Sequence, residues 1–277
     1  MIEFEIVAHR GVPTQAPENT VASFQRALDL GADAIELDVR LTADRVPVVY
    51  HYFQLEENTS ARGAIFDFSF EQLQQVRVFP KHNLGGTDSR ISSLIEILEI
   101  FAGKIGLEIE IKGPEAEAPE IIGEILLSYQ SGWDRMEITS YEPALLLAIQ
   151  RICPGIPADL LFPRSQNWMT PEVVQYLALH TARLAGARAV HLHPSQLSAD
   201  TVASIQRQGI DIHAWDVNDE QSLELIASLE IPRICTDHFT QALDFRNRLA
   251  RADKWGDALE KRDDDLTHHK IRRKRTY

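Results

Sequence analysis

The hydrophobic pattern of the chain alternates between two periods. Apolar residues with the two-residue period of strands fall near residues 3–9, 34–39, 105–112, 136–140, 157–162, 188–193, 210–217 and 231–236. Segments with a helical period lie near residues 19–30, 92–102, 117–131, 142–151, 171–183, 199–208 and 219–229, and a last one starts at about residue 240. Strand–helix units repeated eight times over about 250 residues predict an α/β fold, a single (βα)8 TIM barrel. A doubly wound open sheet is the alternative, but its Gly-x-Gly-x-x-Gly fingerprint follows none of these strands.

Residues that commonly begin or end helices stand at several of these boundaries. Gly31 is predicted to end the first helix. The predicted N-cap residues are Asn19, Ser140, Thr170, Ser198 and Asn218.

One further strand, residues 46–51, breaks the alternation. Only Leu41 to Arg45 separate it from the preceding strand, whereas a parallel crossover needs a dozen or more residues. We therefore expect an antiparallel hairpin excursion after the second strand. In one register His51 lies across from Glu36 on the same face, and a one-residue slip turns it away, so the register stays open.

Charged residues occupy one face of two predicted strands. Residues 35–40 read Ile-Glu-Leu-Asp-Val-Arg, so Glu36, Asp38 and Arg40 share a face opposite an apolar one. Two carboxylates about 7 Å apart along a strand suit a hard cation. Residues 107–112 again alternate apolar and charged residues. Together the two strands predict a metal and phosphate site. The alternative is a pair of half-exposed strands whose charged faces meet solvent.

Composition limits the class of protein. With 277 residues, 44% of them hydrophobic and 25% charged, the chain can bury one large core. We see no repeat or linker and expect one barrel domain over residues 1–250. The net charge of −13 disfavours nucleic acid as a partner. It also means that local cations would have to attract an anionic substrate.

The chain has no recognisable membrane or export segment. The first strand pattern begins almost at Met1, so we expect no signal peptide, and no apolar run approaches the ~20 residues that span a bilayer. We therefore expect a cytoplasmic protein without stable membrane insertion. Cys153 and Cys235 lie in apolar surroundings and are predicted to be reduced core thiols. The oligomeric state is left open.

Residues 251–277 form a charged C-terminal helix end and tail. Asp263-Asp264-Asp265 precede a basic run from Lys270 to Arg275. A surface helix that frays into a solvated tail is the favoured interpretation. A membrane-surface or acidic-partner role for the basic run is the alternative, which the adjoining acidic run disfavours.

An ordered set of motifs resembles one enzyme family. The motifs are His9-Arg10-Gly11, Pro17-Glu18-Asn19-Thr20, Glu36-x-Asp38, Pro47-Val-Val-x-His51 and Glu110-x-Lys112, with weaker matches at Ser140-Tyr141-Glu142-Pro143, Trp215-Asp-Val-Asn218 and Thr236-Asp237. Over roughly residues 5 to 245 the chain resembles the glycerophosphodiester phosphodiesterases. The resemblance implies a (βα)8 barrel that hydrolyses small glycerophosphodiesters to glycerol 3-phosphate and an alcohol with a divalent metal.

The resemblance also implies roles for individual residues. Glu36, Asp38 and Glu110 would hold the metal, and an all-carboxylate set favours Mg2+ or Ca2+ over zinc. His9 and His51 would be the general acid and base, in an order that the sequence leaves open. The glycerol 2-hydroxyl would attack phosphorus and water would open the cyclic phosphate, so no protein nucleophile is needed.

Four further residues would bind the substrate or its phosphate: Arg10, Lys112, Glu18 and Trp215. The two cations would neutralise the non-bridging oxygens. Each assignment has a structural alternative, in which His9 is a buried barrel histidine, Glu18 and Asn19 cap the first helix, and Trp215 packs in the core.

Four other charged or titratable residues belong to the predicted barrel strands. Glu108 is expected deeper in the lumen beside a cation, and the alternative is that it is an extra metal ligand. His191 and His193 share a strand face that can line the lumen. Arg40 is expected to neutralise neighbouring carboxylates.

The chain departs from the family pattern around His51. Tyr52 replaces the acidic residue that usually follows this histidine, and Glu57-Asn58 replace the usual Arg-Thr pair. Farther along the chain, Asp216 replaces the threonine that usually follows the tryptophan. Loss of the nearby carboxylate should lower the pKa of His51. A non-catalytic phosphate-ester binding barrel therefore stays open. So does a lysophospholipase D-like activity that would use the aromatic loop of residues 66–70.

Overall fold

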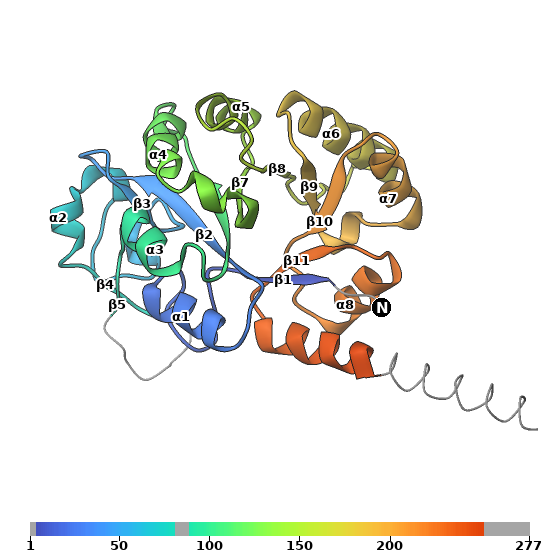
Figure 1. Ribbon diagram of the computed structural model, residues 1–277, viewed down its shortest axis with the longest axis horizontal. Coiled ribbons are helices and arrows are strands. Elements are labelled where there is room, and N and C mark those ends of the chain that lie inside the picture. Colours follow the sequence, from blue (N-terminus) through green and yellow to red (C-terminus); the bar gives the residue numbers. More distant parts are fainter. Residues whose placement is uncertain (1–3, 81–88, 252–277) are drawn as a thin grey trace, which may run out of the picture.

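The computed structural model describes residues 4–80 and 89–251. In this part of the chain, eight parallel strands form a closed barrel in the order β1-β11-β10-β9-β8-β7-β6-β2, and β1 pairs with β2 to close it (Figure 1). The strands are β1 (Glu5–Ala8), β2 (Ala34–Leu41), β6 (Gly106–Ile111), β7 (Met136–Ser140), β8 (Ala158–Leu161), β9 (Ala189–Leu192), β10 (Asp211–Ala214) and β11 (Arg233–Thr236). The predicted (βα)8 barrel is confirmed.

Helices surround the barrel and follow the strands along the chain. They are α1 (Val21–Asp29), α3 (Leu94–Phe101), α4 (Ala118–Leu127), α5 (Pro143–Ile152), α6 (Pro171–Leu184), α7 (Ala199–Gln206) and α8 (Glu220–Ser228), followed by helical residues 239–251. Short 3-10 helices span Leu55–Glu57, Ile65–Asp67, Gln130–Arg135 and Pro194–Gln196. The predicted strand at residues 210–217 is too long, because the chain leaves the sheet after Ala214.

The predicted hairpin is present. β3 (Pro47–Val49) runs antiparallel to β2, with Val39 opposite Val49 and Arg40 opposite Val48. The segment that follows carries α2 (Phe70–Leu73), β4 (Arg77–Val78) and β5 (Ser89–Arg90), which lie to one side of the barrel (Figure 1). The sequence pattern did not predict these short elements, which pack around a separate small apolar cluster that includes Tyr50, Leu55 and Ile65.

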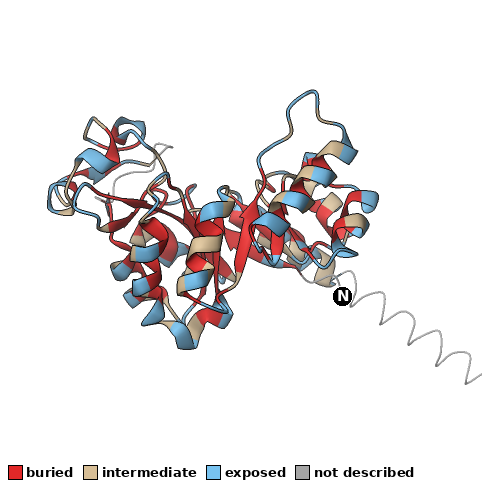
Figure 2. Ribbon diagram, turned by 90° about the horizontal axis from the view of Figure 1, so that it is seen from above, coloured by how far each residue is buried: buried red, intermediate tan, exposed pale blue. Residues whose placement is uncertain are grey.

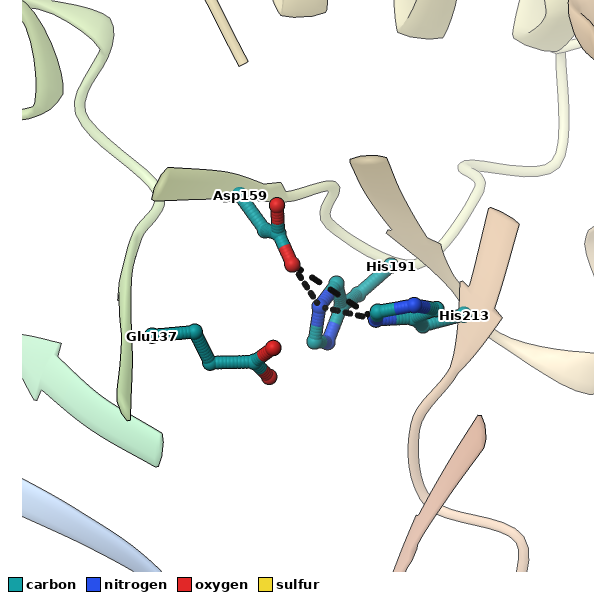
Figure 3. Close-up of side chains that lie close together, drawn as sticks. All are labelled: Glu137, Asp159, His191 and His213. Carbon is teal, nitrogen blue, oxygen red and sulfur yellow. Dashed lines mark hydrogen bonds and ion pairs between the residues drawn. The ribbon is translucent and has the colours of Figure 1, made fainter. Parts of the chain in front are cut away.

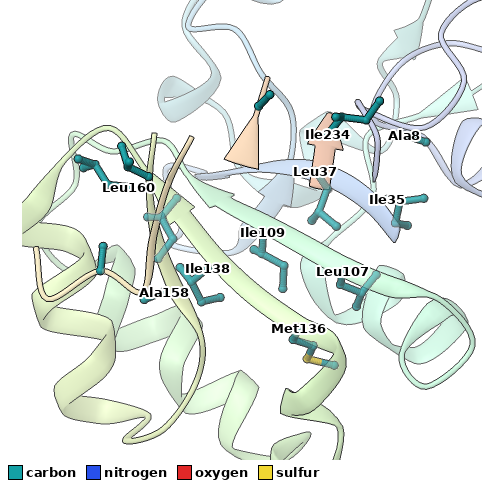
Figure 4. Close-up of a cluster of buried hydrophobic side chains, with 14 of the residues drawn as sticks. Ala8, Ile35, Leu37, Leu107, Ile109, Met136, Ile138, Ala158, Leu160 and Ile234 are labelled. Atoms are coloured by element: carbon teal, nitrogen blue, oxygen red, sulfur yellow. The ribbon is translucent and has the colours of Figure 1, made fainter. Parts of the chain in front are cut away.

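The main core lies between the barrel strands and the helices. Ile35, Leu37, Leu107 and Ile109 point into this layer from β2 and β6 (Figure 4). All residues of both strands are buried, and buried residues line the whole barrel (Figure 2). The charged faces of these strands therefore point into the barrel, and the alternative of half-exposed strands with solvated charges is wrong.

Several predicted caps are displaced by one or two residues. Thr20, rather than Asn19, caps α1, and its hydroxyl accepts a hydrogen bond from the Ser23 amide. Asp219, rather than Asn218, caps α8 in the same way, while α5 starts after Glu142 instead of Ser140. Thr170 and Ser198 do precede α6 and α7, and Gly31 follows the end of α1 with φ +79°.

Three remaining expectations concern the rest of the chain. Cys153 and Cys235 are free and buried, as predicted. Within residues 4–80 and 89–251, no helix is both long and apolar enough to cross a membrane. The Asp263–Asp265 run and the basic run from Lys270 to Arg275 lie outside the described residues.

Candidate active site

Two neighbouring strands bring the predicted metal ligands together. β2 pairs in parallel with β6, which sets Glu36 opposite Glu108 and Asp38 opposite Glu110. One carboxylate oxygen each from Glu36, Asp38 and Glu110 lies within 4.8 Å of the other two, and all three residues are buried. The three carboxylates thus form one cluster on the inner face of the barrel.

Two cations lie against this cluster. The Arg10 Nε atom is 3.1 Å from Asp38 Oδ2. The Lys112 Nζ atom is 2.8 Å from Glu110 Oε1 and 3.4 Å from Asp38 Oδ1. The acids therefore hold both predicted phosphate-binding cations at the same place.

The electrostatics of the cluster favour a further positive charge. Burial and the Asp38 charge raise the pKa of Glu36 to about 8. Burial raises the pKa of Glu110 to about 7, although Lys112 opposes the rise. Burial also acts to raise the pKa of Asp38, but Arg10 and Lys112 outweigh it and hold that pKa well below its usual range. These shifts show that crowding of the acids costs free energy.

The donor set fits a divalent cation. The buried Asp38 Oδ1 atom accepts no hydrogen bond from the residues that the structure describes. Three acids face Arg10 and Lys112 here, and the His9 ring adds a third positive charge when it is protonated. Oxygen ligands of this kind are those that Mg2+ and Ca2+ prefer.

A strained turn carries the first motif. Arg10 has φ 54° and Gly11 has φ 86°. A Cβ on Gly11 would lie 2.4 Å from the Ser23 hydroxyl oxygen, so only glycine fits there. The Arg10 amide donates a 3.0 Å hydrogen bond to Glu36 Oε2. The turn thus fixes the first motif against the carboxylate cluster.

A carboxylate holds the His9 ring. The His9 Nδ1 atom is 2.7 Å from Asp237 Oδ1, and His9 Nε2 is 3.8 Å from Glu36 Oε2. Burial and then the Arg10 charge act to lower the pKa of His9. The hydrogen bond to Asp237 and the Glu36 charge outweigh them and raise this pKa to about 9. His9 is therefore protonated at neutral pH.

His51 reaches the site through a loop. The β2–β3 register does not set it opposite Glu36, and the pairing ends at Val49. Arg40 Nε donates to the His51 carbonyl at 2.7 Å, and Arg40 Nη1 donates to the Gly113 carbonyl at 2.9 Å. As expected, Arg40 interacts electrostatically with neighbouring carboxylates, those of Asp38, Glu115 and Glu110. Its hydrogen bonds in addition hold the main chain beside the site.

The surroundings of His51 are apolar and cationic. The Tyr52 ring lies edge-on to the imidazole, with centroids 4.7 Å apart. Burial lowers the pKa of His51 to about 3, and the Arg10 and Lys112 charges add to the effect against Asp38. The direction agrees with the prediction made from Tyr52. The buried Nδ1 atom has no hydrogen-bond partner among the described residues.

The two imidazoles face one cavity of about 180 Å³ at the carboxylate cluster. Its lining includes His9, Arg10, Glu36, His51, Glu110, Lys112, Tyr141 and Trp215. A second cavity of about 490 Å³ shares His51, Glu110 and Lys112 with it and extends past Tyr52 and Phe53. His51 thus lies where an inner and an outer cavity meet.

The loop after the first strand supports the site. The Arg10 Nη1 atom lies 3.3 Å from Glu18 Oε1. The Asn19 amide nitrogen donates to Asp38 Oδ2 at 2.7 Å, and its Oδ1 accepts from the Asp38 amide at 3.2 Å. Since Thr20 caps α1, the helix-cap alternative for Glu18 and Asn19 is wrong.

Trp215 lies just beyond β10 at the cavity. Its ring packs edge-on against Tyr141, with centroids 5.9 Å apart. The indole Nε1 is buried without a hydrogen-bond partner in the described structure. Trp215 therefore lines the cavity as well as packing against neighbouring apolar residues.

Sequence reasoning missed the residues that orient His9. Asn218 donates from Nδ2 to Asp237 Oδ2 at 2.9 Å and accepts from the Asp237 amide at 2.9 Å. The available signals were the Thr236-Asp237 and Trp215-to-Asn218 motifs at strand ends. Asn218 was interpreted as a helix cap and Asp237 as part of a weak motif match. Neither was therefore predicted to orient His9.

Of the three residues predicted to line the deeper lumen, two do so and one does not. Glu108 is buried with Arg233 Nε 3.8 Å from its Oε2, as predicted. His191 is buried in the lumen. His193 is not in the lumen, because β9 ends at Leu192 and its Nδ1 pairs with the Ser195 hydroxyl.

Comparison with known proteins gives consistent matches. The model of the Glycerophosphoryl diester phosphodiesterase family matches residues 9–241. The chain is 28% identical over 237 residues to a glycerophosphodiester phosphodiesterase of Caldanaerobacter subterraneus subsp. tengcongensis, which covers 84% of this chain and 93% of that protein. It is 26% identical over 252 residues to the same-named protein of Bacillus altitudinis, which covers 88% of this chain and 99% of that protein.

A solved structure also shares the fold. An Oleispira antarctica phosphodiesterase, determined in complex with the product sn-glycerol-3-phosphate, superposes with a TM-score of 0.74 at 24% identity. The match covers 87% of this chain and 96% of that one.

Proposed function

Because the chain belongs to the glycerophosphoryl diester phosphodiesterase family, and is thus a phosphoric diester hydrolase, we propose that it hydrolyses glycerophosphodiesters to glycerol 3-phosphate and an alcohol at the His9–His51 cavity. One observation carries the proposal. Two imidazoles face the same cavity, which is bordered by three buried carboxylates and two cations.

Glu36, Asp38 and Glu110 would hold a Mg2+ or Ca2+ ion. When bound, the ion supplies positive charge against the phosphoryl oxygens. Arg10 and Lys112 neutralise the same group from the protein side, as the fixed cations of an electrostatically preorganised site.

The two histidines divide the proton transfers. His51 is neutral and takes the proton of the glycerol 2-hydroxyl as that oxygen attacks phosphorus. His9, charged and held by Asp237, gives its proton to the departing alcohol. Water then opens the cyclic phosphate with the two roles reversed. Asp237 and Asn218 are positioning residues for His9.

The substrate itself provides the nucleophile. A hydroxyl held beside phosphorus reacts as an intramolecular group, with a large advantage in effective concentration. The complex of the Oleispira antarctica relative with sn-glycerol-3-phosphate supports a glycerol phosphate moiety as the retained part of the substrate. Trp215 and Glu18 would border this moiety.

The outer cavity favours a small polar alcohol. Its lining combines the charged residues Arg40, Glu57, Lys112 and Glu142 with the rings of Tyr52, Phe53 and Tyr141. The charged groups would have to be desolvated by an acyl chain, which disfavours one. An exposed aromatic pair lies beside this cavity. Phe53 is part of its lining, and the Phe66 ring packs edge-on against Phe53 with centroids 6.4 Å apart. These rings are the specific observation that supports the lysophospholipase D-like alternative.

Release of glycerol 3-phosphate from glycerophosphocholine and glycerophosphoethanolamine tests the proposal, with Mg2+, Ca2+ or chelator. His9→Ala and His51→Ala should each lower kcat by about 10²–10⁴-fold. His180→Ala changes an exposed histidine of α6 and should retain full activity. Turnover of lysophosphatidylcholine alone would establish the second activity. Absence of metal-dependent turnover on every diester would leave a non-catalytic binding barrel.

A further inference from the structure

A second group of potential metal ligands lies deeper in the barrel. Glu137, Asp159, His191 and His213 come from the four successive strands β7 to β10 and point toward one another (Figure 3). One ligand atom from each lies within 4.8 Å of the others, and all four residues are buried. Neither imidazole nor Asp159 lines the inner cavity of the candidate active site.

Three of these atoms have the spacing of ligands around a small metal ion. His213 Nδ1 lies 3.0 Å from His191 Nε2, and Asp159 Oδ2 lies 3.5 Å from His191 Nε2 and 3.6 Å from His213 Nδ1. Zinc bonds of about 2.0–2.2 Å in a tetrahedron set neighbouring ligand atoms about 3.3–3.6 Å apart. The triangle is therefore close to one face of a tetrahedral site.

We propose that Asp159, His191 and His213 bind a zinc-class divalent metal in the barrel lumen, with Glu137 as the fourth ligand. Two imidazole nitrogens with carboxylate oxygens suit Zn2+, Co2+ or another late first-row ion, whereas the carboxylate cluster above suits Mg2+ or Ca2+. The barrel then has two chemically different metal sites.

The surroundings of two ligands support the proposal independently of the spacing. Glu137 is 4% exposed, its Oε1 atom has an ion-pair contact with Arg233 but no hydrogen bond among the described residues, and Figure 3 shows its carboxylate directed toward the imidazoles. His191 Nδ1 is buried without a hydrogen-bond partner there and lies 3.6 Å from Glu108 Oε1. A carboxylate behind the far nitrogen of a histidine is the usual orienting partner of a metal-bound imidazole.

Arginines balance part of the charge. Arg188 Nη2 lies 2.6 Å from Asp159 Oδ2 and 2.8 Å from Glu137 Oε2, while Arg233 Nε lies 3.1 Å from Glu137 Oε1. Arg233 is shared with Glu5 and Glu108. Burial and the Glu137 charge raise the pKa of Glu108 well above its usual range, so Glu137 and Asp159 are the acids that the two guanidinium groups balance. The alternative is a metal-free network in which the imidazoles bond only to each other and to Asp159.

An entry path exists from the opposite end of the barrel. A cavity of about 400 Å³ is lined by Glu137, Arg188 and Arg233 together with residues at the starts of the strands. An ion can approach Glu137 from this side without crossing the active-site cavity.

Metal binding to the full chain tests the proposal. Protein stripped with chelator would be titrated with Co2+ and with Zn2+, and bound metal would be counted by mass spectrometry. We expect one equivalent that survives desalting and, for Co2+, the intense visible absorption of tetrahedral coordination. His213→Asn should weaken this binding at least tenfold, because its amide replaces Nδ1 in the hydrogen bond but is a poor ligand.

Matched variants separate the two sites. Asp38→Asn removes a carboxylate of the upper cluster and should leave the tetrahedral Co2+ spectrum intact. His191→Gln keeps a polar group near the Nε2 position and should abolish it, with circular dichroism to verify the fold. The proposal is overturned if the wild type binds no more Co2+ than His213→Asn, or if its spectrum depends on Asp38 instead.

Discussion

The barrel holds two clusters of buried ionisable groups that differ in what surrounds them. The upper cluster of Glu36, Asp38 and Glu110 borders a cavity, and its cations come from a loop and a strand end. The lower cluster around Asp159 and His191 is flanked by arginines from the starts of strands, and its Glu137 lines a cavity at the opposite end of the barrel. Both clusters arise because alternate side chains of a barrel strand point into the lumen.

The comparison shows how position along a strand decides the use of a buried charge. At the C-terminal ends of the barrel strands, the loops form a cavity that substrate and a metal ion can enter. A bound ion can therefore relieve the repulsion among the acids there. Deeper in the lumen the arginines of the fold stay next to the acids whether or not an ion is bound, so the loss of one acid leaves a buried charge without its partner. Substitutions in the upper cluster should therefore change turnover, and those in the lower cluster should change stability.

The largest expected effect is the loss of turnover in Asp38→Asn. Asp38 is fully buried and contacts both Arg10 and Lys112, and we propose it as a metal ligand. Loss of several kcal/mol of electrostatic stabilisation corresponds to a fall in kcat/KM of at least about 10³-fold. Glycerol 3-phosphate release measures it, with the exposed Glu99→Gln as control. Wild-type activity in Asp38→Asn would contradict the assignment.

Asp159→Asn should show the opposite behaviour. Its carboxylate bonds Arg188 and accepts from the Ala189 amide at 3.1 Å. Removing one member of a buried pair costs about 3–5 kcal/mol, and about 2–3 kcal/mol here because Arg188 is half exposed. In metal-free protein, thermal unfolding should shift down by about 5–10 °C. Activity at 25 °C should stay within about threefold of the wild-type value. A loss of turnover as large as that of Asp38→Asn, without a change in stability, would contradict the comparison of the two clusters.

Asp237→Asn tests the link between the loop and the chemistry. Asp237 holds the His9 ring and raises its pKa, so the variant should lose about 10–100-fold in kcat with little change in KM. Because His9 must be protonated to act as the acid, the alkaline limb of the kcat profile should move to lower pH. A loss with an unmoved limb would point to a purely structural role.

The smallest effect is a pH dependence of stability. The pKa of Glu36 rises to about 8 on folding, so the folded state holds a proton that the unfolded chain releases. Its contribution is complete below the unfolded value near 4.5 and is lost as pH rises toward 8. Metal-free wild type should therefore lose a few °C more than Glu36→Gln between pH 5 and pH 8. Saturating Mg2+ or Ca2+ should remove the difference, and parallel curves without metal would contradict the raised pKa.

The sequence predicted the barrel because each element needed only local information. Alternating apolar residues and helical periods specify strands and helices, and their order along the chain allows few other topologies. The segment between β3 and β5 was missed, because its short pieces have no period long enough to detect and are stabilised by a separate apolar cluster around Tyr50 and Leu55.

Two asparagines show where local rules fail. Asn19 and Asn218 carry good cap side chains, but Thr20 and Asp219 are equally good caps one residue later. This frees the first amide to bind Asp38 and the second to bind Asp237. A cap rule cannot separate neighbours of equal propensity, since the choice depends on a partner from another strand.

The residue order alone determined that Glu36 and Asp38 share one strand face, because alternation is a property of the extended backbone. Which way that face points, and that Glu110 and His9 meet it, required the closed barrel, in which strands distant in sequence become neighbours. The lower cluster is the extreme case. Its four proposed ligands come from four strands, and only the curvature of the sheet brings one atom of each within 4.8 Å of the others.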